Sequence, residues 1–240
     1  MNKLIVTTAT AALLGSMAMA QGDVVRLGTE GAYPPYNFIN DAGEVDGFER
    51  ELGDELCLRA ELNCTWVTND WDSIIPNLVS GNYDAIIAGM SITEERAEVI
   101  AFSDPYTQPD PSAFLALSEV DLENAVIAAQ SGTIQASYVT GMAGATLLEF
   151  ATPDETISAV RSGEADAVLA DKAFLEPIAE NDAELSFVGE DVLIGGGIGL
   201  GLRQSDTELR DTFSAAIQSM KDDGTLNELI EKWLPGSATF

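Results

Sequence analysis

The stretch SIIPNLVSGNYDAIIA, residues 73–88, has a counterpart later in the chain. Residues 155–170 read ETISAVRSGEADAVLA, at a constant offset of 82 positions. Both stretches run from a helical pattern through Ser-Gly and a short turn to Asp-Ala and an apolar strand. The glycine suits a helix C-terminus that needs positive φ. Any helix-turn-strand unit shares some of these features, so the repeat favours two similar lobes only weakly. The matched positions are Ser80/Ser162, Gly81/Gly163, Asp84/Asp166, Ala85/Ala167 and Ala88/Ala170.

Strand-like and helix-like segments alternate on both sides of the repeat. Apolar runs predict strands at residues 24–29, 65–68, 84–88, 126–129, 146–150 and 167–170. Helical spacing predicts helices at 48–62, 73–79, 93–99, 207–220 and 226–233, and others that start near 135, 153 and 171. This alternation predicts an α/β fold with mostly parallel sheets.

Two segments could connect the lobes. QPDPS at 108–112 is a strong breaker of regular structure, and GGGIG at 195–199 is a flexible run. We therefore expect a first lobe from residues 21–109 and 200–240 and a second lobe from 110–199. Two connecting strands are a natural hinge for lobes that close on a ligand.

The composition excludes several functions. The 240 residues include 40 Asp and Glu, 11 Lys and Arg and no His, for a net charge of −29. Such a surface repels phosphate, so nucleic-acid binding and attraction to anionic membranes are not expected. Without histidine there is no His-based catalysis and no imidazole metal site. We expect no catalytic group, no metal and no cofactor. The charge itself suits either steering of cationic ligands or adaptation to a salty medium.

Residues 1–20 have the pattern of a secretory signal peptide. Lys3 precedes an apolar stretch, and Ala18-Met19-Ala20 is a small-x-small cleavage site. The alternative, a membrane anchor, needs a longer apolar segment, of roughly 20 residues. We therefore expect an exported, soluble protein of the periplasm. We also expect a monomer.

The two cysteines fit an oxidising compartment. Cys57 comes late in the predicted helix 48–62, and Cys64 opens the strand after it. A disulfide between them is favoured over two buried thiols, and a metal site with two cysteines and no histidine is not expected.

Several motifs together resemble one known family, the periplasmic solute-binding proteins of polar amino-acid ABC importers. The resemblance covers nearly all of the chain after the signal peptide. It implies a two-lobed periplasmic-binding-protein fold of type II, an amino-acid ligand between the lobes and a membrane permease as partner. The Cys57/Cys64 pair also resembles a disulfide of the lysine/arginine/ornithine- and histidine-binding branch. The motifs are GTEGAYPPYNF (28–38), GFE (47–49), DAIIAGMSITEER (84–96), FSDPY (102–106), QSGT (130–133), ADAVLAD (165–171), GLGLR (199–203) and DGTLNELIEKW (223–233).

Arg96 is the candidate for binding the ligand carboxylate, because a guanidinium pairs bidentately with a planar anion. Ser91-Ile-Thr-Glu94 has a capping-box pattern, which places Arg96 in the first turn of a helix. A cation there opposes the helix dipole and is tolerable beside an anion. The alternative is a surface arginine paired with a neighbouring glutamate.

Asp171 ends an apolar strand, where open α/β sheets bind ligands. The resemblance gives it the ligand ammonium, together with Ser91 and the Gly89 carbonyl. Its alternative role is to cap the helix that follows. By the same resemblance Thr133 and Gln135, from the loop QSGTIQ at 130–135, reach the ligand from the second lobe.

The ligand side chain has three further candidates. Tyr33 and Trp71 resemble an aromatic pair that sandwiches it, although core packing is the usual role of a single aromatic residue. Glu30 resembles the acidic residue that meets the far end of basic ligands; the alternative is a solvent-exposed carboxylate. Glu30 and Asp171 in one closed pocket favour a cationic ligand, since buried charges need partners.

The ligand predicted by these residues is a basic L-amino acid, namely arginine, lysine or ornithine. Ala88-Gly89 replaces two serines common in the basic branch, and Ile134 replaces a common threonine, so a neutral polar amino acid or an opine stays open. A cyclohexadienyl-dehydratase-like enzyme and the sensing ectodomain of a signalling system are less favoured functions for the same scaffold. Such an enzyme would need a general acid beside the bound ring. Glu30 or Asp171 could serve in principle, and no histidine is available.

Overall fold

The first of two five-stranded sheets combines strands from the first part of the described chain with one strand from much later in it. The computed structural model describes residues 24–240, so the predicted signal peptide lies outside the described residues. Four of its strands run in one direction, and β13 runs antiparallel between β6 and the edge strand β7. Its strands, in spatial order, are β5 (Cys64–Thr68), β1 (Val25–Thr29), β6 (Ala85–Ile86), β13 (Gly201–Leu202) and β7 (Ala101–Phe102).

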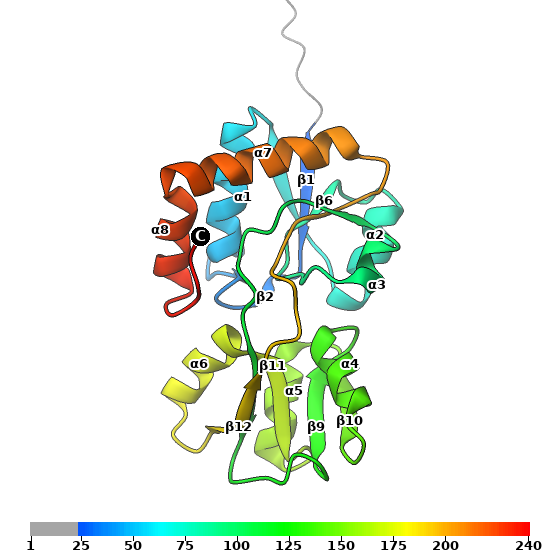
Figure 1. Ribbon diagram of the computed structural model, residues 1–240, viewed down its shortest axis with the longest axis vertical. Helices are drawn as coiled ribbons and strands as arrows, with labels where there is room; N and C mark the ends of the chain where they lie inside the picture. Colours follow the sequence, from blue (N-terminus) through cyan, green and yellow to red (C-terminus); the bar gives the residue numbers. More distant parts are fainter. Residues whose placement is uncertain (1–23) are drawn as a thin grey trace, which may run out of the picture.

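The second sheet repeats this order with strands from the middle of the chain. Again four strands run in one direction, and β8 runs antiparallel between β11 and the edge strand β12. Figure 1 shows the two sheets in separate lobes, joined by two extended segments. The prediction of an α/β fold with two similar lobes is confirmed. The strands, in spatial order, are β10 (Thr146–Phe150), β9 (Val126–Gln130), β11 (Ala167–Asp171), β8 (Ser112–Ala116) and β12 (Ser186–Val192).

The two copies of the sequence repeat form equivalent helix-turn-strand units, one in each lobe. Asp84 precedes β6, and its carboxylate accepts the backbone N–H of Arg26 at 3.0 Å. Asp166 precedes β11, and its carboxylate accepts the backbone N–H of Val126 at 2.8 Å. Each aspartate thus ties its own strand to the neighbouring parallel strand, β6 to β1 and β11 to β9. Gly81 and Gly163 have φ of 80° and 75°, as the helix ends require.

The helices of the first lobe include a group built from distant parts of the chain. In Figure 1, α7 crosses the top of this lobe, next to α1 and α8. Phe48 and Leu52 of α1 share a buried core with Phe213 of α7 and Ile230 of α8. The helices are α1 (Phe48–Arg59), η1 (Trp71–Ser73), α2 (Ile74–Val79), α3 (Glu94–Ala97), α7 (Thr207–Asp223) and α8 (Thr225–Trp233).

A small antiparallel sheet of β2 (Ala32–Tyr33), β3 (Asn37–Ile39) and β4 (Val45–Asp46) completes the first lobe. The helices of the second lobe are α4 (Ile134–Gly141), α5 (Pro153–Ser162) and α6 (Lys172–Asn181). Thr152 and Glu155 form a capping box at the start of α5, which is where the sequence predicts that helix.

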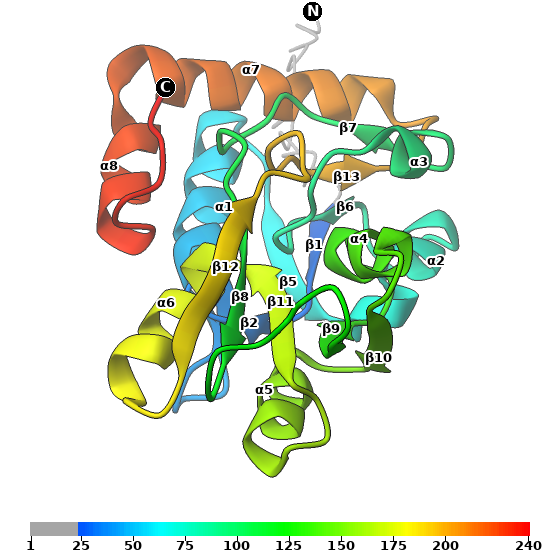
Figure 2. The ribbon, with the colours of Figure 1, turned by 60° about the horizontal axis from the view of Figure 1, so that its bottom comes forward.

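Both main sheets are mixed. Four of the five strands in each run in one direction, as the prediction of mostly parallel sheets expects, and one strand, β13 or β8, runs against them. The antiparallel strands β8 and β12 lie side by side (Figure 2). The residues of β8 are all buried but directly follow the predicted breaker, and most of β12 is exposed and lacks an apolar pattern. The first sheet uses residues 25–102 and 201–202, and the second uses 112–192. The lobe boundaries at 109/110 and 199/200 stay a prediction.

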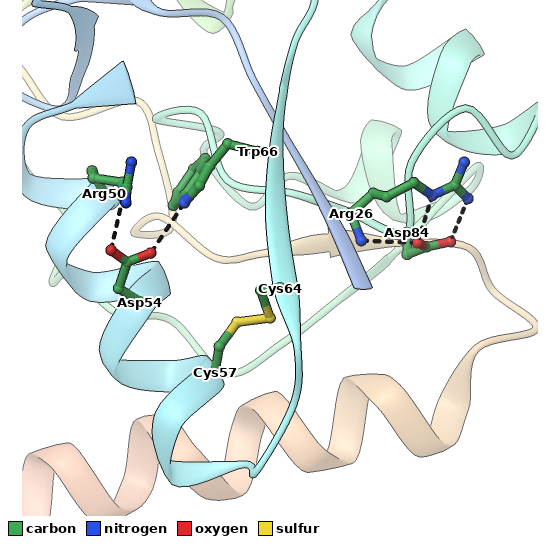
Figure 3. The surroundings of a disulfide bond; sticks show 7 residues. All are labelled: Arg26, Arg50, Asp54, Cys57, Cys64, Trp66 and Asp84. Carbon is green, nitrogen blue, oxygen red and sulfur yellow. Dashed lines mark hydrogen bonds and ion pairs between the residues drawn. A yellow bond between two sulfur atoms is a disulfide. The ribbon is translucent and has the colours of Figure 1, made fainter. Parts of the chain in front are cut away.

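The predicted disulfide is present. Cys57 near the end of α1 is bonded to Cys64 at the start of β5, with 6.2 Å between their Cα atoms (Figure 3). Asp54, one helical turn earlier, pairs with Arg50 and accepts the indole N–H of Trp66 at 3.1 Å. These contacts join α1 to the edge strand of the sheet. Within residues 24–240, no helix combines the length and apolarity needed to cross a bilayer, and no cluster of side chains suits a metal ion.

Candidate functional site

A cavity between the two lobes brings together all nine residues that the sequence analysis selects for ligand contact. Hydrogen bonds cross it at several points, so the lobes are in direct contact in this structure. The side chains that line the cavity are Glu30, Tyr33, Trp71, Ala88, Gly89, Ser91, Arg96, Gln130, Thr133, Ile134, Gln135, Pro153, Leu169, Ala170 and Asp171.

Arg96 reaches the cavity from the short helix α3. Its guanidinium donates to the carbonyl of Ser91 at 2.8 Å and to that of Gly132, in the second lobe, at 3.2 Å. It also lies over the Trp71 ring, 5.3 Å from the centroid. Burial lowers the pKa of Arg96 to about 10. Arg96 forms no ion pair with another described residue, so the alternative of a surface arginine paired with glutamate is wrong.

The helix that carries Arg96 is capped differently from the prediction. Thr93 is the N-cap, and its hydroxyl accepts the backbone N–H of Arg96 at 3.2 Å. The capping box predicted for Ser91 and Glu94 is therefore wrong, although Arg96 does lie in the first turn. Ser91 instead pairs with Ile198 in an isolated β-bridge, which places it at the cavity beside one of the connecting segments.

Asp171 is the last residue of β11, and both oxygens of its carboxylate accept hydrogen bonds. Its two oxygens accept hydrogen bonds from the Tyr33 hydroxyl at 2.7 Å and from Gln135 Nε2 at 3.0 Å. Burial raises the pKa of Asp171, and the bonds from Tyr33 and Gln135 and the charge of Arg96 oppose that rise. The residue occupies the N-cap position of α6, but its side chain makes no capping bond. Its carboxylate therefore faces the cavity network, and the capping alternative is wrong.

Tyr33 and Trp71 are placed in different surroundings. The Tyr33 ring stacks on Phe174 of the second lobe, with 4.5 Å between centroids and 12° between planes. It lies nearly parallel to Tyr36 as well. Trp71 is buried in the core of the first lobe and exposes one side to the cavity. Each aromatic residue therefore has a packing role in addition to its place on the wall.

Glu30 follows β1 and is half-buried rather than solvent-exposed, so the alternative of a solvent-facing carboxylate is wrong. Its Oε1 accepts a hydrogen bond from Gln130 Nε2, across the cavity, at 2.6 Å. Burial raises the pKa of Glu30 to about 7, and the neighbouring Asp70 and Asp72 contribute to the rise.

The backbone positions and the second-lobe loop complete the wall. Gly89 has φ of 61° and donates its N–H to the buried Glu49 carboxylate at 2.6 Å. Thr133 is the N-cap of α4, and its hydroxyl donates to the Gln130 carbonyl at 2.7 Å. Gln135 is buried and bridges Ser112 and Asp171.

The sequence analysis does not select Gln130 or Glu49. Gln130 begins the loop that contains Thr133, directly after a predicted strand, and this position is the signal that could have identified it. Glu49 shows no such signal, because it lies within a helix and its hydrogen-bond partners Asn37, Gly89 and Tyr106 are distant in sequence.

Comparisons with known proteins agree on one family. Residues 25–236 match the model of bacterial extracellular solute-binding proteins, family 3. The lysine/arginine/ornithine-binding periplasmic protein of Escherichia coli is 32% identical, with 96% of this chain and 94% of that protein covered. The arginine-binding periplasmic protein of Mannheimia haemolytica is 31% identical, with 93% and 96% covered.

A solved structure is more similar still. A periplasmic His/Glu/Gln/Arg/opine family-binding protein from Silicibacter pomeroyi, in complex with lysine, is 66% identical. The TM-score is 0.88, over 90% of this chain and all of that one. These relatives are periplasmic binding proteins, which confirms the predicted localisation in the periplasm and the prediction of a binding protein rather than an enzyme. The chain belongs to the bacterial extracellular solute-binding proteins, family 3.

Proposed function

We propose that this protein is the substrate-binding component of an ABC importer and that its ligand is a basic L-amino acid, namely arginine, lysine or ornithine. The observation that carries the proposal is the charge balance of the cavity wall. Glu30 and Asp171 supply two carboxylates, and Arg96 supplies one guanidinium. With both acids ionised the wall has a net charge of −1. A basic amino acid has a net charge of +1, so it balances the net charge of the closed cavity, where desolvated charges need partners.

Each charged group of the ligand has a candidate partner. The Arg96 guanidinium can pair with the α-carboxylate, supported by Thr133 in the second lobe. The α-ammonium suits Asp171, Ser91 and the Gly89 carbonyl. The aliphatic stem of the ligand lies best against Trp71 and Tyr33, and its cationic head meets Glu30.

The relatives support this assignment. Two of the curated relatives are an arginine-binding and a lysine/arginine/ornithine-binding protein. The structure from Silicibacter pomeroyi contains lysine. In this proposal the exported protein works as a monomer that presents its closed form to a membrane permease.

Binding couples to closure of the lobes. The ligand docks on the first lobe through Arg96, and the second lobe then brings Asp171 and Thr133 over it. The two segments that connect the lobes act as the hinge. Ligand stabilises the closed arrangement only through its higher affinity for that arrangement.

A neutral polar amino acid such as glutamine is the second candidate. It is favoured by Glu30, whose pKa of about 7 makes the protonated carboxyl accessible near neutral pH. With Glu30 protonated the wall is neutral and matches a zwitterion. An ancestral arginine-binding protein has been solved with glutamine bound, at a TM-score of 0.81 and 31% identity.

A thermal-shift panel of the mature protein tests the proposal. L-amino acids, opines and polyamines are added one at a time, and ligand at 100 times its Kd adds about 2.7 kcal/mol to the free energy of unfolding. We expect shifts confined to arginine, lysine and ornithine. A shift with glutamine alone would replace the basic ligand by the neutral one. No shift with any α-amino acid would reject the proposal.

A further inference from the structure

The contact between Glu30 and Gln130 joins the two lobes at the wall of the cavity. Gln130 is the last residue of β9, and its Nε2 donates to Glu30 Oε1 at 2.6 Å and to the Ala151 carbonyl at 3.0 Å. We propose, building on the function proposed above, that Gln130 is a specificity-determining residue. It holds the Glu30 carboxylate against the cationic end of the ligand side chain when the lobes are closed.

The hydrogen bonds fix the orientation of the Gln130 amide. The side chain is 8% exposed, and both N–H groups of its Nε2 have acceptors. This leaves Gln130 Oε1 and Glu30 Oε2 as acceptors that no described side chain or backbone group occupies. An ammonium or guanidinium head brings three or more N–H donors and needs several acceptors. An apolar side chain gains nothing from either oxygen.

Gln130 also affects the charge of Glu30. Burial raises the pKa of Glu30, and the nearby Asp70, Asp72 and Glu49 raise it further. The hydrogen bond from Gln130 opposes this rise, because it stabilises the ionised carboxylate. The bond spans the two lobes, so it acts only when they are closed. In the closed arrangement the bond thus offsets part of the effect of burial and keeps more of Glu30 in the charged form that a cationic ligand requires.

A double-mutant cycle with L-arginine as the probe tests the proposal. Its Kd is measured by calorimetry for the wild type, Gln130→Leu, Glu30→Gln and the double variant. We expect Gln130→Leu to weaken binding by about ten- to hundredfold, the range for a hydrogen bond to a charged group. In the Glu30→Gln background the same change should cost less than about threefold, since the charge it supports is gone.

The pH profile separates this role from a structural one. Without Gln130 the carboxylate of Glu30 takes up a proton at higher pH, so the midpoint of the affinity-against-pH curve should move upward in Gln130→Leu. Gln204→Leu is the matched control, because its amide bonds only the carbonyls of Ala97 and Glu98 on the surface. That variant should leave both the Kd and the midpoint unchanged.

Two results would overturn the proposal: equal losses from Gln130→Leu in both backgrounds, or an unmoved midpoint. If Gln130→Leu does not fold, Gln130→Asn replaces it, because the shorter side chain keeps the amide but cannot reach both Glu30 and Ala151. Failure of the proposed function gives a different result. A wild type that binds no basic amino acid rejects both the proposed function and the role of Gln130. If the wild type binds arginine but the substitutions at Gln130 and Glu30 show no coupling, only the role of Gln130 is rejected.

Discussion

At the scale of single residues, Arg96 is a half-buried cation whose guanidinium has two hydrogen-bond partners among residues 24–240, both of them carbonyl oxygens. A guanidinium that bonds only carbonyl oxygens can still pair with the carboxylate of a ligand, because no neighbouring glutamate neutralises its charge. Its Coulomb partner within the cavity network is Asp171, whose charge raises the pKa of Arg96 against the effect of burial.

Arg96→Ala should therefore weaken L-arginine binding at least about hundredfold, since breaking a buried charged pair costs about 3–5 kcal/mol. The ligand-free melting temperature should change little. Isothermal titration calorimetry measures the first quantity and a thermal melt the second. Arg161→Ala, which removes an exposed arginine paired with Asp182, is the control. Unchanged arginine affinity in Arg96→Ala would remove Arg96 from the site.

Glu30 gives the site a dependence on pH. Its carboxyl group has a pKa of about 7 without ligand, and only the ionised form attracts a cation. Arginine affinity should fall as the pH drops through 7, by up to about tenfold per unit well below it. Glu30→Gln should bind more weakly and lose most of this dependence; what remains belongs to Asp171, whose pKa is also raised. A wild-type affinity that is flat from pH 5.5 to 8 would contradict the assignment.

The sequence predicts the residues of the cavity better than their contacts. Strand ends and motif positions predict that Arg96 from the first lobe and Asp171 from the second meet at one cavity, because ligands bind at the carboxyl ends of the parallel strands. The bonds of Tyr33 to Asp171 and of Gln130 to Glu30 depend on how the lobes meet. The two partners are 138 positions apart in the sequence in the first bond and 100 in the second, and no local sequence pattern predicts contacts over such separations.

At the scale of elements, the sequence predicts a helix or strand correctly where the hydrophobic period and the residues that break regular structure indicate the same boundaries. The helices at 153–162 and 207–223 begin at the predicted residues, because Pro153 follows an N-cap and Thr207 opens a strong apolar stripe. The sequence predicts neither β8 nor β13. β8 begins at the last residue of the segment 108–112, β13 follows the glycine-rich run 195–199, and both of these segments read as connections. Their sheet pairing is set by tertiary contact, which overrides the local signal.

Asp84 fastens three strands of the first sheet. It accepts hydrogen bonds from the Arg26 side chain at 2.9 and 3.0 Å and from Arg203, after β13, at 3.0 Å. Burial raises the pKa of Asp84, but these bonds outweigh it and lower the pKa to about 2.

A lowered pKa in the folded state means that Asp84 stabilises the protein above its ordinary pKa, near 4, and that this contribution is lost as the pH falls towards 2. Thermal melts between pH 6 and pH 2.5 should show it. The wild type should lose more stability over this range than Asp84→Asn, which starts lower. Parallel curves for the two proteins would contradict the argument, and Asp211→Asn, in an exposed ion pair, is the control.

At the scale of the whole molecule, the net charge of −29 acts against the folded state. Like charges on a compact surface repel one another, and dissolved salt screens that repulsion over about 10 Å at 0.1 M. The ten ion pairs of residues 24–240 offset only a small part of it, because most of their side chains are partly exposed.

The melting temperature of the ligand-free protein should therefore rise by several degrees between 10 mM and 500 mM NaCl. KCl should give the same curve, since screening depends on ionic strength and not on the identity of the ion. A melting temperature that is constant or falls with salt would show that the repulsion is already balanced within the fold. This measurement bears on salt adaptation, while the salt dependence of the arginine association rate bears on steering.

The path of the chain between the lobes also sets an order of assembly. All five strands of the second sheet come from one continuous stretch, residues 112–192. The core of the first lobe needs Phe213, Ile217 and Ile230, which come after that stretch, as well as Leu27 and Phe48, which come before it. A chain whose N-terminal residues appear first can thus complete the second lobe while the first lobe still exposes its apolar helix faces. Until the last two helices arrive, we expect chaperones and proteases to act on the incomplete first lobe rather than on the completed second lobe.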